Sequence, residues 1–459
     1  MPNPNDANAA DNAAAVDAAA QPFLADARVV HLTDELVKEC KNQDKKFSDI
    51  IDDAGHQYID LVMEGGGVLG IALVGYTYVL EKVGLRFLRV GGTSAGAINA
   101  MALGAFGSPA TAKTERMLKV LADAPIAKFI DGDDDAKDFV DSALAGFGLT
   151  KALWKGMQIV DNLRDDLGLN PGDRFRNWLH DVFAAEGVST TDELLKLLAK
   201  LPPGLRVRDG DLLPPAEGAG QVAVVTAEVT TETKVVFPAM AELFWGDPSK
   251  VSPADYVRAS MSIPGFFFPF RVGDVPQGED AARRWKEHYK GVLPREAIFV
   301  DGGVMSNFPI DLFHGKGVPK APTFGVTLGS DQQHPHQIKS FLGLVAATFA
   351  SARNCRDNDF IRKHPDYRKL VAKIDTGPHN WLNFNLTLDD KVDLFWRGAQ
   401  AAAAFLRNFD WPAYRQLRAE LAGCDHDVEP LGDAFRDFDF ISLDPCGCDS
   451  CVRDQQSPS

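Results

Sequence analysis

Short apolar runs that end at glycines alternate with longer apolar stretches in the first quarter of the chain. Each run has the length of a buried strand, about four to eight residues. Each stretch behind the glycines is apolar on nearly every side, and helices without a polar face are buried. Two such units in succession predict an α/β protein of three layers, in which a mainly parallel sheet carries helices on both faces. The strands, glycine turns and helices cover residues 58–63, 65–70 and 71–82, and then 87–90, 91–96 and 95–106.

The pattern changes between residues 108 and 220, where amphipathic stretches replace the fully apolar ones. Residues 173–185 and 191–201 carry apolar side chains at helical spacing, and a proline- and glycine-rich stretch, 202–215, closes the region. An amphipathic helix needs another surface against which to bury its apolar face. We therefore expect a helical insertion that covers one edge of the sheet as a lid.

Sheet and helix patterns return after the insertion. Residues 271–296 interrupt them with charged and irregular sequence, which predicts a surface excursion. Residues 391–406 form an amphipathic helix, and its apolar stripe, which includes Phe395 and Trp396, indicates core packing rather than a cofactor site. The predicted strands cover residues 222–229 and 234–237, which form a hairpin, and residues 297–300 and 323–328.

The two ends of the chain differ in composition from the part between them. The first twenty residues hold nine Ala, four Asn and three Asp, and no basic residue precedes Arg28. A signal peptide requires a positive segment followed by an apolar one, so we expect none. Residues 1–22 are interpreted as a disordered leader, with an irregular helix as the alternative. Residues 23–440 form the expected main domain, and residues 441–459 a cysteine-containing tail.

Cysteine usage predicts the compartment. Six cysteines are few for 459 residues, and four of them come late in the chain. A disulfide scaffold is therefore not expected, and the predicted location is the reducing cytoplasm. The late cysteines, three of them within residues 446–451, leave a zinc site, a reactive thiol tail and an inert tail as alternatives. Their spacing matches no metal motif, and we assign no metal.

The charge balance limits the partners. The chain holds 48 Lys and Arg against 64 Asp and Glu, a formal net charge of −16. This charge repels nucleic acid and gains nothing from an anionic membrane surface. We find no run of about 18 apolar residues, so we expect no membrane-spanning helix. A lipid partner would have to be met from the aqueous side, through transient contact with a membrane or micelle.

The sharpest chemical signal is a Gly-x-Ser-x-Gly sequence between a predicted strand and a predicted helix, with Ser94 between Gly92 and Gly96. A sharp turn there strains the central residue and lifts its hydroxyl clear of the sheet. The flanking glycines are needed because a Cβ would collide with the neighbouring strand and helix. Ser94 is therefore the candidate nucleophile. The alternative is a small-residue turn with an incidental serine.

A run of three glycines, Gly65, Gly66 and Gly67, precedes the first helix. Consecutive N–H groups of glycines can converge on an anion, as a substrate oxyanion requires. The run also fits a dinucleotide-binding fingerprint, which expects an acidic residue at the end of the second strand. That position holds glycines and then Ser94, so the dinucleotide interpretation is disfavoured.

A nucleophilic serine needs a base. Asp301 follows the predicted strand 297–300 and precedes Gly302 and Gly303. In a parallel sheet the carboxyl ends of strands share one edge, so we expect Asp301 and Ser94 to face each other there. An Asp acts poorly as a base unless partial desolvation raises its pKa. A plain β-turn is the alternative for Asp-Gly-Gly.

Four separated segments together resemble the patatin-like phospholipases, a family of lipid acyl hydrolases, in their order and separation over roughly residues 55–410. The segments are Glu64-Gly-Gly-Gly-Val-Leu-Gly70, the turn around Ser94, Ala259-Ser-Met-Ser-Ile-Pro-Gly-Phe-Phe-Phe-Pro269 and Asp301-Gly-Gly-Val-Met-Ser-Asn-Phe-Pro309.

The resemblance implies a Ser–Asp dyad in which Ser94 is the nucleophile and Asp301 the base, with an oxyanion site made by the backbone of Gly65, Gly66 and Gly67. It implies hydrolysis of carboxylic esters in phospholipids or lysophospholipids through an acyl-enzyme. No cofactor and no metal is needed, and activity without calcium follows. The protein would be cytoplasmic and would meet membranes only at their surface.

One position departs from the family, and it leaves one alternative open. Two further alternatives concern the catalytic base and the apolar segment near the site. Leu69 stands where the family usually has a basic residue, which leaves a catalytically weak lipid-binding protein as an alternative. An ordinary Ser–Asp–His esterase would use Ser94, Asp301 and a late histidine such as His364. The apolar segment 266–270 could line an acyl channel or pack in the core.

Overall fold

A computed structural model describes residues 18–132, 167–313, 315, 317–329, 364–381 and 383–424. Ten strands of this part form one sheet in the order β10-β9-β2-β3-β5-β8-β7, with β1, β4 and β6 attached beside this path. The strands from β10 to β5 run parallel, which confirms the predicted α/β class with a mainly parallel sheet. The strands are β1 Ile50–Ile51, β2 Gln57–Met63, β3 Leu85–Thr93, β4 Arg206–Val207, β5 Gln221–Glu228, β6 Thr233–Phe237, β7 Phe270–Val272, β8 Ala297–Asp301, β9 Thr323–Leu328 and β10 Val371–Ile374.

The elements predicted from the apolar pattern all form, and their ends differ by a few residues. The expectation of an irregular surface excursion at 271–296 is wrong in part, because β7 and α12 lie there and the indole of Trp285 is fully buried. The α-helices are α2 Ala27–Asn42, α3 Gly70–Lys82, α4 Ala95–Ala105, α5 Thr114–Ala122, α8 Asp173–Ala185, α9 Thr191–Leu198, α10 Pro215–Gly218, α11 Pro253–Ser260, α12 Glu279–Trp285, α14 Leu388–Asn408 and α15 Trp411–Cys424.

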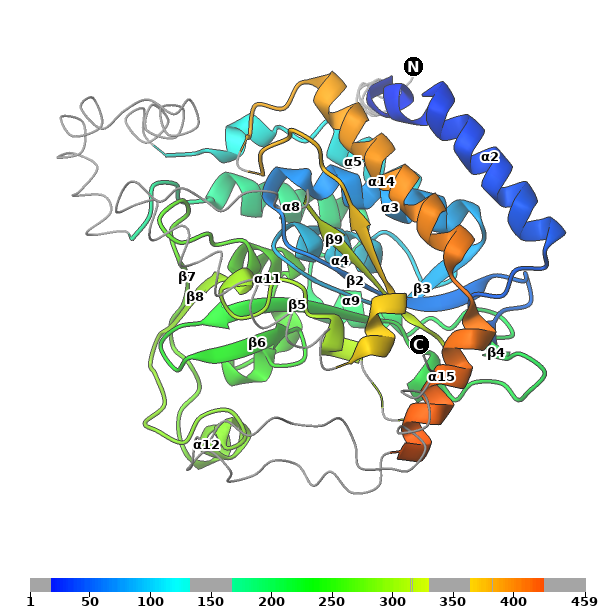
Figure 1. The fold of residues 1–459 in the computed structure, drawn as a ribbon. Coiled ribbons are helices and arrows are strands. Elements are labelled where there is room, and N and C mark those ends of the chain that lie inside the picture. The colour runs from blue at the N-terminus through cyan, green and yellow to red at the C-terminus, as the bar shows by residue number, and fades with distance from the viewer. Residues whose placement is uncertain are drawn as a thin grey trace, which may run out of the picture.

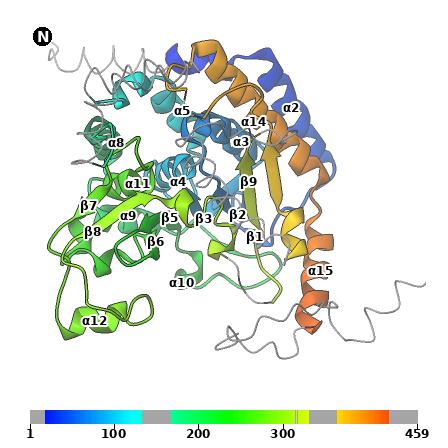
Figure 2. The same cartoon turned by 60° about the vertical axis from the view of Figure 1, so that its left-hand side comes forward.

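Helices α3, α14 and α2 lie against one another on one side of the sheet (Figures 1 and 2). Two glycines allow the backbones of α3 and α14 to touch. A Cβ on Gly398 would lie 1.8 Å from the carbonyl oxygen of Ala72, and one on Gly75 would lie 2.0 Å from that of Phe395. The buried side chains of Phe395 and Leu406 confirm that the stripe of α14 is core. This packing holds α3, and with it the glycine turn that precedes α3.

The opposite face of the sheet is covered in part by the segment Phe308–Phe313. A Cβ on Gly91 of β3 would lie 2.7 Å from Leu312, and one on Gly325 of β9 would lie 2.5 Å from the ring of Phe308. The glycines on this face therefore let the chain after β8 lie flat on the sheet as it crosses from β8 to β9. This crossing brings the residues that follow Asp301 over the centre of the sheet.

Strand β8 does not run in the direction that we expected, because it pairs antiparallel with β5. Residues 221–225 of β5 pair with β3, residues 226–228 pair with β8, and β6 pairs along 224–228. The residues of β5 that pair with β6 include some that pair with β3 and all that pair with β8. Strand β6 therefore occupies one edge of β5, and β3 and β8 share the other edge. The carboxyl ends of β3 and β8 therefore meet head to head, Thr93 opposite Val225 and Asp301 opposite Thr226.

The expected boundary of the leader at residue 22 is too late. Residues 18–24 are helical, and Ala20 and Phe23 are fully buried, Phe23 against the ring of Phe395. For residues 18–22 the alternative of a helix is the correct one, because burial of apolar surface offsets the entropy of ordering them. Residues 1–17 and the tail from 425 onward lie outside the described residues.

The predicted insertion is helical where it is described. Helix α9 packs on α4 and α8 packs on α11, beside the strands that carry the glycine turns. Strand β4, at the end of the insertion, pairs with β1 at the amino end of the sheet. Residues 133–166, which were expected to belong to the same lid, lie outside the described residues.

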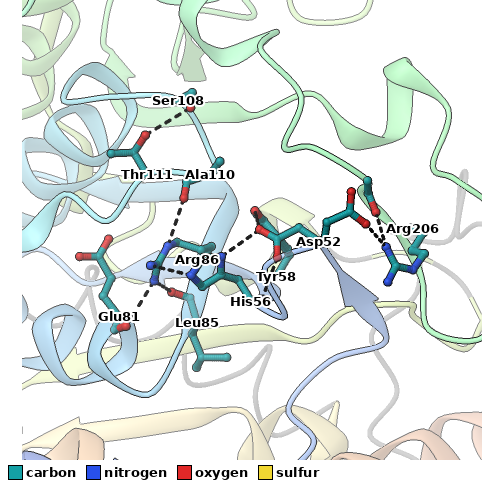
Figure 3. A network of polar contacts seen from close by, with 12 residues as sticks. Asp52, His56, Tyr58, Glu81, Leu85, Arg86, Ser108, Ala110, Thr111 and Arg206 are labelled. Carbon is teal, nitrogen blue, oxygen red and sulfur yellow. Dashed lines mark hydrogen bonds and ion pairs between the residues drawn. The ribbon is translucent and has the colours of Figure 1, made fainter.

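A polar network joins the amino ends of β2 and β3 (Figure 3). Ser94 follows the opposite, carboxyl end of β3. Arg86 donates to the backbone carbonyls of Glu81 and Leu85 and contacts Nε2 of His56 at 3.1 Å. A guanidinium only donates, so Nε2 accepts and Nδ1–H of His56 donates to Asp52 at 2.9 Å. Both nitrogens of His56 are thereby occupied in structural contacts.

The start of helix α5 beside this network gives a testable pH dependence. Lys113 is 3% exposed, and desolvation lowers its pKa to about 8. The unfolded chain therefore binds more protons than the native protein between about pH 8 and pH 10.5, and the free energy of unfolding rises with pH in this window. Lys113→Met is expected to remove a rise of roughly 2 kcal/mol between pH 7 and pH 9.5 in urea unfolding. Exposed Lys250→Met serves as the control, and an unchanged rise in the Lys113 variant would refute the assignment.

Candidate active site

Ser94 lies at a strained turn between β3 and α4. Its backbone angles are φ 52° and ψ −115°, a left-handed conformation that is costly for any residue but glycine. Its N–H donates to Oγ of Ser260 at 2.9 Å, and the hydroxyl of Ser260 donates to the carbonyl of Val225 at 2.6 Å. Ser260 thus ties the strained turn to strand β5. A strained strand-to-helix turn is the setting expected for a candidate nucleophile, and Ser94 is 5% exposed there.

The two glycines beside Ser94 are required by space, as predicted. A Cβ on Gly92 would lie 2.4 Å from the carbonyl carbon of Gly96 and 2.8 Å from the carbonyl oxygen of Met63. A Cβ on Gly96 would lie 2.1 Å from the oxygen of Met63 and 2.9 Å from that of Glu64. The turn can therefore approach the end of β2 only because both residues lack a side chain.

Gly96→Ala is expected to destabilise the protein by roughly 3 kcal/mol or more, because backbone atoms on both sides would have to move. Thermal unfolding of the variant measures the effect. Gly246→Ala is the matched control, since a Cβ on Gly246 meets nothing within 4 Å and should leave stability nearly unchanged. Equal melting temperatures for Gly96→Ala and wild type would show that the turn is looser than the distances require.

Asp301 reaches the turn from strand β8. Its N–H donates to the carbonyl of Ser262 at 2.8 Å, and its Oδ1 accepts the N–H of Gly303 at 2.7 Å. The next residue, Gly302, is so close to β3 and β5 that a Cβ would lie 2.2 Å from the oxygen of Val225 and 3.0 Å from Thr93. The structure thus brings Asp301 to the residue that precedes Ser94. It does so through the head-to-head meeting of β3 and β8, and not through a shared edge of parallel strands.

The glycine run lies beside Ser94. A Cβ on Gly65 would lie 3.2 Å from Cβ of Ser94. The N–H of Gly65 donates to the carbonyl of Asn307 at 3.1 Å, so it does not point at a substrate, and its expected role as an oxyanion donor is not supported. The N–H groups of Gly66 and Gly67 make no hydrogen bond to a described residue. These two remain as candidate donors.

Side chains that the sequence reasoning did not single out hold the glycine run in place. Asn307 donates through Nδ2 to Oε1 of Glu64 at 2.7 Å and to the carbonyl of Gly65 at 3.2 Å. The other oxygen of Glu64 accepts the N–H of Leu328 at 2.6 Å. Glu64, Ser260 and Asn307 each lie inside a different one of the four segments that resemble the family. Their membership of these motifs is the sequence signal that could have identified them.

Arg258 is a further residue that was not singled out from the sequence. It is 3% exposed, and desolvation lowers its pKa to about 10. Its guanidinium donates to Oγ of Ser262 at 2.5 Å and to the carbonyls of Pro171 and Phe268. Since the carbonyl of Ser262 receives the N–H of Asp301, this cation braces the segment on which Asp301 rests.

An apolar cavity opens at Ser94. The side chains of Asn99, Phe175 and Phe384 line it, together with Gly67, Val68, Gly70, Ile71, Ala95, Ile98, Leu121, Ala124, Ile126, Phe129, Trp178, Met261 and Ile263. The segment 266–270 is not part of this lining. Phe267 is fully buried, and Phe266 stacks on Phe384 at 5.0 Å, so these two rings pack behind the cavity. Leu69 is also buried in the core, where a basic side chain would be desolvated.

Three described histidines are engaged in other hydrogen bonds: His56 with Asp52 and Arg86, His180 with Ser252, and His379 with Asp393. His364 comes before β10, at the amino ends of the parallel strands, with its ring 6.1 Å from that of Tyr367. No group of three or more His, Cys, Asp or Glu in the described part of the chain could hold a metal, and the cysteines after 424 lie outside it. None of the described helices is both long and apolar enough to span a membrane.

Comparisons with known proteins bear on the family to which the chain belongs. The chain is 28% identical over 356 residues to the uncharacterized protein YqhO of Bacillus subtilis (strain 168), a match that covers 77% of this chain and all of YqhO. The crystal structure of VipD from Legionella pneumophila matches with a TM-score of 0.38 and 17% identity, over 79% of this chain and 70% of VipD. The family model for patatin-like phospholipases matches residues 61–314. This chain therefore belongs to the patatin-like phospholipase family, whose members are lipid acyl hydrolases.

Proposed function

We propose that this protein hydrolyses carboxylic ester bonds of phospholipids or lysophospholipids, with Ser94 as nucleophile and Asp301 as base. The observation that carries the proposal is the strained backbone of Ser94. Its turn is held by the hydrogen bond to Ser260, and Ser94 lines an apolar cavity. A strained backbone at a small residue indicates a functional constraint, since it costs stability without improving packing. An apolar cavity beside a nucleophile suits an acyl chain.

In the first step Asp301 accepts the proton of the Ser94 hydroxyl as Oγ attacks the ester carbonyl carbon. The carbonyl π electrons move to its oxygen and form a tetrahedral oxyanion. When the C=O bond re-forms, the ester C–O bond breaks, and the leaving alcohol takes the proton from Asp301. The product is an acyl-enzyme on Ser94 and a free lysophospholipid or glycerophosphate alcohol.

In the second step water replaces the alcohol. Asp301 takes one proton of the water as its oxygen attacks the acyl carbon. The tetrahedral intermediate then expels Oγ of Ser94, which recovers its proton from Asp301, and the fatty acid leaves. We assign the oxyanion donors to the N–H groups of Gly66 and Gly67, because that of Gly65 is used by Asn307.

The net charge bears on how the protein meets its substrate. At −16 the protein as a whole is repelled by anionic bilayers, so neutral lipids, lysolipids and micelles are the favoured targets. We propose a cytoplasmic enzyme that contacts lipid surfaces transiently through apolar side chains near the cavity. None of the described histidines supports the alternative of a Ser–Asp–His esterase. The alternative of a catalytically weak lipid-binding protein rests on Leu69 alone, which replaces the usual basic residue.

Product analysis tests the proposal. Micelles of neutral phospholipid and of lysophospholipid are incubated with the protein in ¹⁸O-water and a calcium chelator. The expected result is release of fatty acid that carries ¹⁸O in its carboxylate, because the oxygen of water ends on the acyl carbon when the acyl C–O bond breaks. Release of unlabelled fatty acid would exclude cleavage of that bond, and absence of any release from all esters would overturn the proposal.

A further inference from the structure

The segment between β10 and α14, residues 375–386, lies against the glycine run. We call it the strap; its residue 382 lies outside the described part of the chain. The carbonyl of Trp381 accepts the N–H of Val68 at 3.0 Å. Gly67 has a φ of +54°, and a Cβ there would lie 2.2 Å from the same carbonyl oxygen. The strap therefore touches the candidate oxyanion donor Gly67 and the residue that follows it.

The strap also closes one side of the cavity. Phe384 is 7% exposed, lines the cavity and stacks on Phe266 with an angle of 10° between the rings. One short segment thus contacts both the candidate oxyanion donors and the acyl-sized cavity. A shift of the strap would change both.

The strap is held to α14 by a cluster of charged side chains. Nε2 of His379 lies 3.0 Å from Oδ2 of Asp393, and Nδ1 lies 3.6 Å from Oδ1 of Asp390. The imidazole is only 9% exposed. Arg397 donates through Nε to Asp393 at 2.6 Å and through Nη1 to the carbonyl of Asp375 at the start of the strap. Two side chains therefore clamp the strap to the same helix.

Both carboxylates beside His379 are held in the ionised form. The hydroxyl and N–H of Thr387 lower the pKa of Asp390. Burial tends to raise the pKa of Asp393, but hydrogen bonds from Arg397 and His379 outweigh it and lower the pKa. An ionised carboxylate only accepts hydrogen bonds, so Nε2 of His379 donates to Asp393. Asp390 lies beyond hydrogen-bond distance of Nδ1.

We propose that His379 is a positioning residue, which through its hydrogen bond to Asp393 seats the strap on the glycine run and so aligns Gly66 and Gly67 for the oxyanion. The inference rests on the proposed function. The charged groups that face His379 are Asp390 and Asp393, with Arg397 and Asp375 completing the clamp. Loss of the imidazole removes the hydrogen bond to Asp393 and loosens the strap, and kcat falls more than substrate binding does.

The test compares wild type, His379→Leu and His379→Gln with His31→Leu as control. His31 forms a histidine–carboxylate pair of the same kind with Glu35, but its side chain is 74% exposed on α2. The first readout is hydrogen exchange of the peptide spanning 65–70, which contains the Val68 amide. We expect roughly tenfold faster exchange at Val68 in His379→Leu, and wild-type exchange in His31→Leu.

The second readout is steady-state ester hydrolysis. We expect His379→Leu to lower kcat about tenfold with KM changed less than threefold. His379→Gln keeps one donor for Asp393 and should restore part of the loss, so its kcat should lie between those of wild type and the Leu variant. Equal exchange and equal kcat in wild type and His379→Leu would overturn the inference. If wild type releases no fatty acid, the proposed function fails instead, and the exchange of Val68 still decides whether His379 seats the strap.

Discussion

Replacing Ser94 by alanine is expected to abolish release of fatty acid from phospholipid, with a loss of roughly 10⁴-fold or more in kcat. The reason is that the acyl-enzyme forms on Oγ, and no other described hydroxyl lies at a turn with this strain and this cavity. The variant should fold, because alanine keeps the Cβ and the N–H that Ser260 accepts. Lipid mass analysis after incubation with a phospholipid mixture measures fatty acid and lysolipid.

Ser249→Ala is the matched control, since Ser249 is exposed and hydrogen-bonds only locally to Asp247. Wild type and Ser249→Ala should also react with a fluorophosphonate probe, and Ser94→Ala should not. If the Ser94 variant keeps the product yield of wild type while its melting temperature is unchanged, the nucleophile lies elsewhere.

Asp301→Asn is expected to reduce kcat by roughly 10³-fold. The amide has nearly the shape of the carboxylate, and its oxygen can still accept the N–H of Gly303. It cannot take the proton of Ser94, so the loss reports on the base rather than on the fold. Steady-state hydrolysis of a short-chain ester, together with the melting temperature, separates these two effects.

Two controls define the result. Asp311→Asn removes a carboxylate that pairs with Lys234 in the same crossing segment and should leave kcat within about twofold. His364→Ala should also keep activity, because a dyad needs no histidine. The dyad would be refuted by an active Asp301→Asn, and an inactive His364→Ala would favour the Ser–Asp–His esterase.

Much of the site was readable because its chemistry is local. Ser94, Gly92 and Gly96 belong to one continuous turn. The two glycines of the pentapeptide stand at the positions where a Cβ would collide with the backbone of Met63. The oxyanion role of Gly66 and Gly67, which was predicted from the glycine run, stays a prediction. The structure does not support that role for Gly65, because its N–H donates to the carbonyl of Asn307, which is more than 240 residues away in the chain.

The parallel α/β core and the strained serine turn followed from local patterns, since apolar periodicity and glycine spacing act over a few residues, and four motif segments indicated the family. Long-range packing fixed the remaining features. It set the direction of β8, because pairing depends on which neighbour a strand meets and not on its own pattern. It also decided that Arg258 braces Asp301 and that the strap with His379 reaches the glycine run. Buried charges and carbonyls take whichever partner the fold places within hydrogen-bond distance, and no local pattern records that choice.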